Sequence, residues 1–534
     1  MTCSSTRYRT LHNDTVPRLA SDAPLSRPPA TPTRPSIQRL VLAWFGGTAL
    51  VLSARSLLGV WGALGSDAPL WGLTARDLLA GAPPLVPPLY PAFLALLVGP
   101  GASPVTAGAL VSAASLSLLL LTGHALARSL GASARSAVAI AISLLVIPDI
   151  PGWGFQLQPD STAAAAGLLL ALGLVRVHRP GAHRSDAALV VFVAGLAPLL
   201  REHGLVWAGV GFMGLAASGR STRLHAFWVP VVVWCGPLLV GIAPGLHPLD
   251  VSWADRAGGA LAAFVATEPG ALDFLRELPR SERASYAALL SERDRFGQWM
   301  WHLQRTARLA PDGWLLIASA MFLAIRSRRW VDGRRWWVAT LPLVAALPAL
   351  LIWSQRRHVL LVVPVAIVVV ATRAARNHRL GLLFAVVLLL HGAINWPGSV
   401  RAWQSERPRA EHYAELGQWL HAHATKGDLL GGVHQDVGLY APALPRHDPD
   451  GSNADWRTFF ISERPPPDHP AGAWSAVHRG PQLAIWQLEP SRVPRPCAGV
   501  PPPSDAPHLA IAQSQVTLTE CVGLAAPVGD PSGD

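Results

Sequence analysis

The chain has 534 residues, of which 51% are hydrophobic and only 14% are charged. Because an ordinary soluble domain has about 25% charged residues, this composition excludes an average soluble protein. The formal net charge of +11 comes from arginine, with Lys426 the only lysine. These arginines lie in short connections between apolar blocks and not along one stripe, so we expect a lipid bilayer as a partner and no nucleic acid.

The polar residues 1–39, rich in Ser, Thr, Pro and Arg, predict a disordered cytoplasmic tail ahead of a retained first helix. Apolar blocks then follow one another as far as residue 396. Since a span needs roughly 20 apolar residues, these blocks predict about eleven transmembrane helices. We expect these helices at residues 40–64, 105–127, 136–148, 161–175, 187–200, 204–218, 225–245, 312–325, 336–353, 358–372 and 380–396.

The arginines orient these helices, because eleven spans with a cytoplasmic N-terminus divide the connections into two sets. One set is strongly basic and predicts the cytoplasmic side of a plasma (inner) membrane. Its arginines are Arg128, Arg135, Arg176, Arg179, Arg184, Arg220, Arg223, Arg326, Arg328, Arg329, Arg334, Arg335, Arg373, Arg376 and Arg379. Tryptophans at the expected helix ends predict an aromatic belt, as at Trp61, Trp71, Trp153, Trp353 and Trp396 on the outer side.

The other set of connections predicts two long outer loops, 65–104 and 246–311. Residues 82–100 are apolar but carry five prolines before residue 92, and no cytoplasmic arginine follows them. We therefore expect helices lying at the membrane surface there and not a further span.

The C-terminal residues 397–534 then lie outside as well. They combine a helical stretch, Ala410 to His423, with strand-like runs such as Gln482 to Leu488. This mixture predicts a small extracytoplasmic α/β domain. Cys497 and Cys521 in this region form either a disulfide or two unpaired thiols.

Two acidic positions stand where a base for an outer-face reaction would be needed. Asp67 follows the first span directly, and Asp77 comes ten residues later. A carboxylate there can take the proton of an acceptor hydroxyl, although an ordinary interfacial Asp is the alternative. Asp160, after Gln158, precedes an Ala/Leu-rich helix, which fits either a helix N-cap or sugar binding.

Two basic groups lie on the outer side, where arginine is unexpected. The first is Arg201-Glu202-His203 and the second is Arg356-Arg357-His358. A fixed phosphate would account for them because guanidinium groups bind phosphate bidentately, the alternative being snorkelling or pairing with Glu202. Arg55, inside the first apolar block, turns toward the same site or snorkels. Histidines within apolar blocks, such as His391, read as structural, so we expect no metal site and no cofactor.

The order of these segments resembles the GT-C superfamily of integral membrane glycosyltransferases. The resemblance rests on Asp67 after the first span, on LTARDLLAG at 73–81 and PPLYP at 87–91, and on the later segments QPDSTAAAAGLLLAL, AGLAPLLREHG, QRRHVLLVVPVAI and EHYAELGQWLHAHATKGDLL. Two positions depart from the family pattern. Ala68 stands where a second acidic residue is common, and His358 stands where an aromatic residue is expected.

The resemblance implies an α-helical polytopic fold with a GT-C-like transmembrane domain at 40–396. It also implies an inverting transfer of a hexosyl or pentosyl group from a polyprenyl-phosphate donor to a glycan, lipid or protein acceptor. Asp67 would be the catalytic base, and Arg201, Arg356 and Arg357 would bind the donor phosphate. The implied substrate-binding residues are Asp77, Tyr90, Gln158, Asp160, Glu202, His203 and His358.

Two other functions remain open, a transporter or flippase of an anionic or lipid-linked substrate and a catalytically inactive scaffold. Transporters carry charges near the middle of their spans and often have repeated halves. Here the unusual charges lie at the outer ends of the expected helices, and the sequence has no visible repeat. This distribution favours the transferase.

Overall fold

The computed structural model describes residues 37–60, 68–79, 86–179, 181–201, 204–219, 223–239, 303–327, 333–346, 356–423, 429–432, 439, 458–462, 474–479 and 484–488. Several predictions concern residues outside these ranges, namely residues 1–36 of the tail, most of the loop 246–311, Asp67, Glu202, His203, Cys497 and Cys521. The predicted tail ends earlier than expected, because the first helix begins at Ile37.

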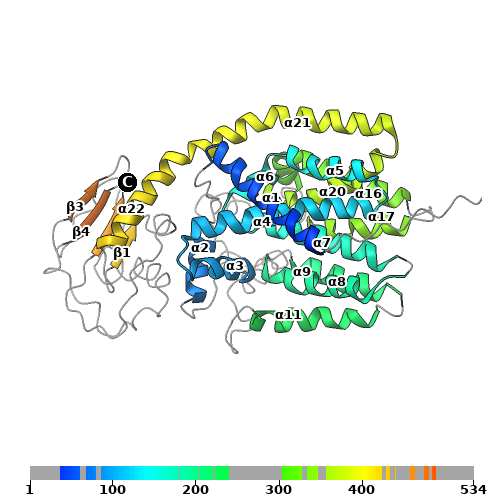
Figure 1. The fold of residues 1–534 in the computed structure, drawn as a ribbon, viewed down its shortest axis with the longest axis horizontal. Helices are drawn as coiled ribbons and strands as arrows, with labels where there is room; N and C mark the ends of the chain where they lie inside the picture. Colours follow the sequence, from blue (N-terminus) through cyan, green and yellow to red (C-terminus); the bar gives the residue numbers. More distant parts are fainter. Residues whose placement is uncertain are drawn as a thin grey trace, which may run out of the picture. The chain divides into compact units, whose positions relative to one another are not determined.

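The described residues are mostly helical (Figure 1). The α-helices are α1 (Ile37–Leu57), α2 (Ala68–Leu79), α3 (Leu89–Val98), α4 (Pro104–Ser129), α5 (Ala134–Ser143), α6 (Asp149–Phe155), α7 (Asp160–Val177), α8 (Arg184–Leu196), α9 (Gly204–Ala216), α11 (Trp228–Leu239), α16 (Pro311–Ser327), α17 (Gly333–Thr340), α19 (Arg356–Leu360), α20 (Val363–Ala374), α21 (His378–Ser405) and α22 (Arg407–His423). Short 3-10 turns are η1 (Leu144–Val146), η2 (Ala197–Leu199), η3 (Leu224–Phe227) and η4 (Leu341–Ala346).

Small residues allow α4 to pack closely against the segment that leads into α7. A Cβ added to Gly108 on α4 would lie 2.5 Å from Cγ of Leu157, so only glycine fits at this contact. The facing side of α7 is rich in alanine, and Ala163 and Ala164 are fully buried. Membrane helices commonly associate through such small residues, because lipid supplies no hydrophobic driving force between helices. The two helices form the centre of the bundle.

Two of the expected spans, 136–148 and 312–325, meet a further short helix at a sharp bend. The axes of Ala134–Val146 and α6 meet at 78°, and those of Leu303–Leu309 and α16 meet at 104°. A proline stands at each break, Pro148 directly before α6 and Pro311 as the first residue of α16. Because proline lacks a backbone N–H and restricts the residue before it, a helix ends there and a new one begins at another angle.

The chain is a multi-pass membrane protein. By length and composition, four of the described helices can cross a bilayer, and each bent pair would add one more, up to six. Further apolar helices of 10–17 residues, including α9 and α20, are shorter than a full span. The expected count of about eleven spans therefore stays a prediction. Helix α3 has 10 residues and extends about 15 Å, which is shorter than a span, and its expected place at the membrane surface stays a prediction.

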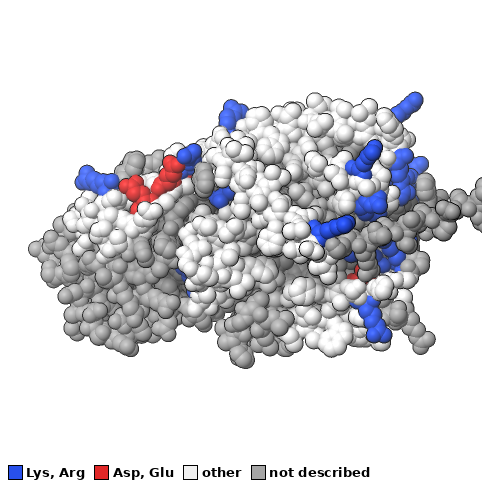
Figure 2. All heavy atoms as spheres, viewed as in Figure 1, with Lys and Arg blue, Asp and Glu red and all other residues white. Residues whose placement is uncertain are grey.

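Arginines gather at one end of the helices. Arg128 ends α4 and Arg176 ends α7, while Arg379 lies in the first turn of α21. Contacts join these ends, since Arg179 donates to the carbonyl of Ser129 and Arg376 donates to that of Leu130 at 2.9 Å. Figure 2 shows most basic side chains of the visible face gathered at one end of the bundle. The separation of basic ends from the other ends is therefore present in space, and its inside-to-outside direction stays a prediction.

The C-terminal region contains a small sheet beside α22. Strands β1 (Leu429–Gly432), β2 (Thr458–Ser462), β3 (Trp474–Arg479) and β4 (Ala484–Leu488) are ordered β1-β2-β4-β3, with β1 and β2 parallel and the other pairs antiparallel. His478 on β3 lies 3.5 Å from Glu415 on α22 and stacks on Trp419 at 5.6 Å between ring centroids. The predicted small α/β region is confirmed, including the helix at 410–423 and a strand within 482–488.

Candidate functional site

Asp160 and Arg201 form a buried ion pair between the start of α7 and the end of the α8 segment. Arg201 donates from Nη2 to Oδ1 of Asp160 at 2.5 Å, and the side chains are 3% and 0% exposed. The residues are 41 positions apart in the chain. The N-cap of α7 is Pro159, so the N-cap alternative for Asp160 is wrong. The carboxylate turns to the buried guanidinium instead, because an unpaired charge there would be strongly destabilising.

A second polar chain runs from α3 across α4 to the same entry of α7. The hydroxyls of Tyr90 and Ser112 are 3.1 Å apart, and Ser112 donates to the carbonyl of Gln156 at 2.7 Å. The carbonyl of Gln158 lies 3.4 Å from the same hydroxyl. Tyr90 is fully buried and Gln158 is 6% exposed. Helices α3 and α4 therefore fix the approach to Asp160 from one side.

Trp71 on α2 links these two groups. Its ring meets the Tyr90 ring edge-on at 5.9 Å, and the guanidinium carbon of Arg201 lies 6.0 Å from its centroid. Burial raises the pKa of the Tyr90 phenol far above its usual value, and the charge of Asp160 acts in the same direction. Tyr90 is therefore a neutral hydrogen-bonding group. We call Trp71, Tyr90, Ser112, Gln158, Asp160 and Arg201 the Asp160–Arg201 cluster.

Two oxygen atoms at the entry of α7 are left without a hydrogen bond inside the described part of the chain. These are Oδ2 of Asp160 and Oγ of Ser161, and both residues are fully buried. Buried polar atoms in native proteins are nearly always hydrogen-bonded. The two atoms therefore supply hydrogen-bonding capacity at the entry of α7.

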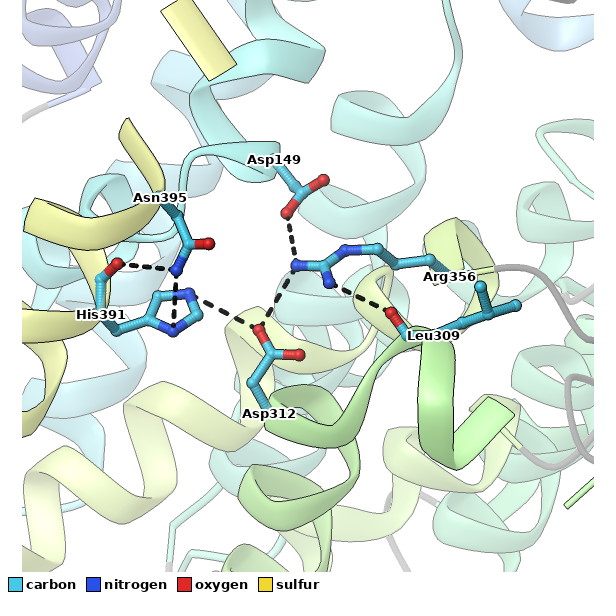
Figure 3. A network of polar contacts seen from close by, with 6 residues as sticks. All are labelled: Asp149, Leu309, Asp312, Arg356, His391 and Asn395. Atoms are coloured by element: carbon cyan, nitrogen blue, oxygen red, sulfur yellow. Dashed lines mark hydrogen bonds and ion pairs between the residues drawn. The ribbon is translucent and has the colours of Figure 1, made fainter. Parts of the chain in front are cut away.

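Arg356, the first residue of α19, lies at the centre of a second cluster (Figure 3). Its Nη2 donates to Oδ2 of Asp149 at 3.0 Å and contacts Oδ2 of Asp312 at 3.4 Å, and its Nη1 donates to the carbonyl of Leu309 at 3.1 Å. His391 on α21 lies 3.6 Å from the same oxygen of Asp312. Asn395, one turn further, donates to the carbonyl of His391 at 2.8 Å. These six residues form the Arg356 cluster.

The Arg356 cluster braces both broken helices. Asp149 is the first residue of α6, and Leu309 and Asp312 stand on either side of the break before α16. Because two carboxylates already face the guanidinium, a phosphate would meet net negative charge beside Arg356. Its expected role in binding phosphate is therefore disfavoured, and a role in holding the helix ends together is favoured.

We expect Arg356→Gln to lower the melting temperature of the full-length protein in detergent. The change removes three polar contacts and leaves Asp149 and Asp312 facing each other, a loss of about 1–2 kcal/mol after allowing for partial exposure. Arg356→Lys should restore only part of the stability, because lysine lacks the planar guanidinium fork. Fluorescence-monitored thermal unfolding measures the effect.

Arg357→Gln is the matched control, because it removes the neighbouring arginine and leaves the Arg356 cluster intact. We expect it to shift the melting temperature less than Arg356→Gln does. Equal melting temperatures for Arg356→Gln and the unaltered protein would show that Arg356 does not brace the bends.

The other predicted site residues lie on α19, on α2 and outside the described residues. His358 on α19 is fully buried, and Arg357 beside it is half-buried. Asp77 belongs to α2, and its side chain lies outside the described part. Asp67 directly precedes Ala68, the first residue of α2, while Asp67, Glu202 and His203 themselves lie outside the described residues.

Sequence reasoning missed several polar residues of these clusters. Asp149 and Asp312 share a signal with Asp160, since each follows a proline and begins a helix in the first or second position. Acidic residues are favoured in a first turn by the helix dipole, so this pattern can be found from the sequence. Ser112 gave no such signal, because it lies inside an apolar helix.

The expected aromatic belt needs a correction. Trp71 and Trp153 are 3% and 5% exposed, so both pack inside the protein and do not face lipid. Trp71 is drawn inward by the Tyr90 ring and the Arg201 guanidinium. Within the described ranges, no group of three or more His, Cys, Asp or Glu residues is arranged to hold a metal ion.

No protein-family description matches the chain, and no curated protein matches it. Solved structures do. ArnT from Cupriavidus metallidurans bound to undecaprenyl phosphate matches with a TM-score of 0.49 and 15% identity, over 86% of this chain and 100% of that one. The apo form of the Archaeoglobus fulgidus oligosaccharyltransferase matches with a TM-score of 0.44 and 10% identity, over 79% of this chain and 69% of that one.

The archaeal oligosaccharyltransferase AglB from the same organism, in complex with an inhibitory peptide and a dolichol-phosphate, matches with a TM-score of 0.39 and 12% identity, over 76% of this chain and 65% of that one. At such low identities and TM-scores, the function has to be argued from this chain's own residues.

Proposed function

We propose that this protein is an inverting membrane glycosyltransferase that moves a sugar from a polyprenyl-phosphate donor to an acceptor hydroxyl at the outer face of the plasma membrane. The observation that carries the proposal is the buried Asp160–Arg201 pair with its unused oxygen, Oδ2 of Asp160. A buried charge is expensive in an apolar surrounding, and ionisable groups among membrane helices commonly mark substrate sites.

In this proposal Asp67 removes the proton of the acceptor hydroxyl as its oxygen attacks the anomeric carbon of the donor. The bond from that carbon to the phosphate oxygen breaks, and polyprenyl phosphate leaves with the bonding electrons. Chain connectivity supports Asp67 as the base, because it precedes α2, whose Trp71 contacts Tyr90 and Arg201.

The remaining residues bind and orient the substrates. Oδ2 of Asp160 accepts a hydrogen bond from a sugar hydroxyl, and the other residues that we assign to substrate binding are Asp77, Tyr90, Gln158, Glu202, His203 and His358. Arg201 and Arg357 stabilise the negative charge that gathers on the leaving phosphate. Arg356 takes the bracing role that its two carboxylate partners support.

The experiment that tests the proposal is an assay for release of polyprenyl phosphate. The full-length protein is reconstituted into vesicles with a set of polyprenyl-phosphate sugars and a membrane lipid extract as the source of acceptors. We expect free polyprenyl phosphate and a glycosylated acceptor to appear in equal amounts, measured by mass spectrometry. Protein-free vesicles are the control.

Two other outcomes contradict the proposal. Movement of intact donor across the bilayer, with no release of lipid phosphate, indicates a flippase. Neither movement nor release, with every donor and acceptor extract supplied, indicates a scaffold.

A further inference from the structure

The indole N–H of Trp71 on α2 has no hydrogen-bond acceptor within the described part of the chain. The side chain is 3% exposed, so the N–H is shielded from bulk water as well. Two other tryptophans of the helical region are paired, since Trp44 donates to the carbonyl of Ala114 at 2.8 Å and Trp207 donates to that of Pro342 at 3.0 Å. A buried N–H without an acceptor is costly, and a bound ligand would account for it.

The unpaired N–H of Trp71 belongs to the same cluster as an unpaired acceptor. Oδ2 of Asp160 accepts no hydrogen bond in the described ranges, and Asp160 is fully buried. Arg201 joins the two side chains, because it donates to Oδ1 of Asp160 at 2.5 Å and its guanidinium carbon lies 6.0 Å from the centroid of the Trp71 ring. One donor and one acceptor of hydrogen bonds are therefore held beside the same guanidinium group.

Neighbouring contacts fix the position of the Trp71 ring. The ring meets that of Tyr90 edge-on, with 5.9 Å between the centroids. At the next residue, a Cβ added to Gly72 would lie 2.4 Å from Cδ2 of Leu439 and 3.1 Å from Cβ of Pro104, so α2 is tightly packed here. A donor that is already fixed can bind a ligand with little further loss of side-chain entropy.

The charges of the cluster select the kind of group that fits beside Trp71. Asp160 is paired with Arg201, so these two side chains together carry no net charge. An ammonium group would lie near the guanidinium of Arg201 and a carboxylate would lie near Oδ2 of Asp160, so like charges disfavour both. An ammonium group also cannot accept from the indole N–H, whereas a hydroxyl both donates and accepts. The cluster therefore fits an uncharged hydroxyl.

We propose that Trp71 is a further ligand of the donor sugar, and that its indole N–H donates to the same sugar hydroxyl that donates to Oδ2 of Asp160. The two side chains then select a sugar that carries an uncharged hydroxyl at this position and not an amino group. The inference rests on the proposed function, because it takes the sugar at Asp160 to be that of the polyprenyl-phosphate donor. It adds Trp71 to the substrate-binding residues and defines the class of sugar.

The test measures binding of donor analogues that cannot react, so that it is independent of transfer. The analogues are polyprenyl phosphonates of glucose, mannose and xylose in which CH₂ replaces the glycosidic oxygen, each with its monodeoxy and monoamino forms. We expect at least one parent analogue to bind the full-length protein in detergent, measured by native mass spectrometry. Removing the contacted hydroxyl, or replacing it with an amino group, should weaken binding by about 10- to 100-fold.

Trp71→Phe removes the N–H and keeps an aromatic ring. It should weaken binding of the parent analogue by about tenfold and leave binding of the matching monodeoxy form unchanged. A merely structural role of Trp71 would weaken both equally. Trp207→Phe is the matched control, because Trp207 is also buried but its N–H already donates to the carbonyl of Pro342. It should lower stability and leave both affinities unchanged.

A second substitution keeps the test valid if Trp71→Phe folds poorly. Replacing Trp71 with benzothienylalanine exchanges the N–H for sulfur and keeps the bicyclic shape, so the fold should be preserved and the parent analogue should bind about tenfold more weakly. Equal weakening of the parent and monodeoxy forms, no change in either, or no binding of any parent analogue would overturn the proposal. The expected pattern of binding without release of polyprenyl phosphate from reactive donors would support the sugar site and contradict the transfer alone.

Discussion

Asp67→Asn is expected to lower the rate of polyprenyl-phosphate release by about 10²- to 10⁴-fold, the range that general base catalysis contributes. Asparagine has nearly the same shape as aspartate and can still accept a hydrogen bond, but it cannot take the acceptor proton. The fold should be preserved, because the change removes only one carboxylate charge, directly before α2, and keeps the shape of the side chain. The release assay in vesicles measures the rate, and the amount of protein inserted in membranes is measured in parallel.

Asp186→Asn is a suitable control, because this buried aspartate lies at the arginine-rich end of α8, where it forms a capping box with His183. It should leave the rate of release unchanged. Asp77→Asn separates binding from proton transfer. Loss of a substrate-binding group raises KM, whereas loss of the base lowers kcat. A full rate in Asp67→Asn together with loss of activity in Asp160→Asn would move the role of base to Asp160.

The arrangement of helix ends was largely predictable from the sequence. Composition and arginine spacing identified apolar helices, and the contacts of Arg179 and Arg376 bring the basic ends together as expected. Asp160, Arg201 and Arg356 were each recognised as unusual charges at the opposite ends. These predictions succeed because charge and hydropathy act locally along the chain, so the physical preference of each segment can be read without knowing its neighbours.

The pairing of these residues was not predictable, because it depends on how the helices pack. Asp160 and Arg201 meet across 41 residues, and Asp149 and Arg356 meet across 207. Their partners are chosen by the contact of α7 with α8 and by the two bends. The bends themselves have a local cause in Pro148 and Pro311, which lie at the ends of the expected spans 136–148 and 312–325, but the short helices on the far side of each bend were not expected.

The proline positions also explain why only some residues of the two clusters were predicted from the sequence. At Asp149, Asp160 and Asp312 a proline directly precedes an acid in the first turn of a helix. A helix start supplies unpaired backbone N–H groups and a positive partial charge, so an acid is retained there even within a membrane protein. The three acids then contact arginines from other elements and form two ionic clusters.

Asp160→Ala is expected to destabilise the protein by about 3–5 kcal/mol, the usual effect of removing one partner of a buried ion pair. Arg201 is 2% exposed, so its charge would stay buried without Asp160. We expect a lower melting temperature and less protein in the membrane. Asp149→Ala is the matched control, because its carboxylate is 35% exposed and water can compensate for the lost pair. A melting temperature of Asp160→Ala equal to that of the unaltered protein would contradict the buried pair.

The double variant Asp160→Leu with Arg201→Met separates stability from function. It removes both charges and fills the space with apolar side chains, so most of the stability should return. Activity should not return, because neither the oxygen offered to the sugar nor the positive charge offered to the phosphate is present. A stable double variant that still releases polyprenyl phosphate at the full rate would assign the pair to folding alone. A stable but inactive one would show that the pair is retained for the reaction, since the fold does not require it.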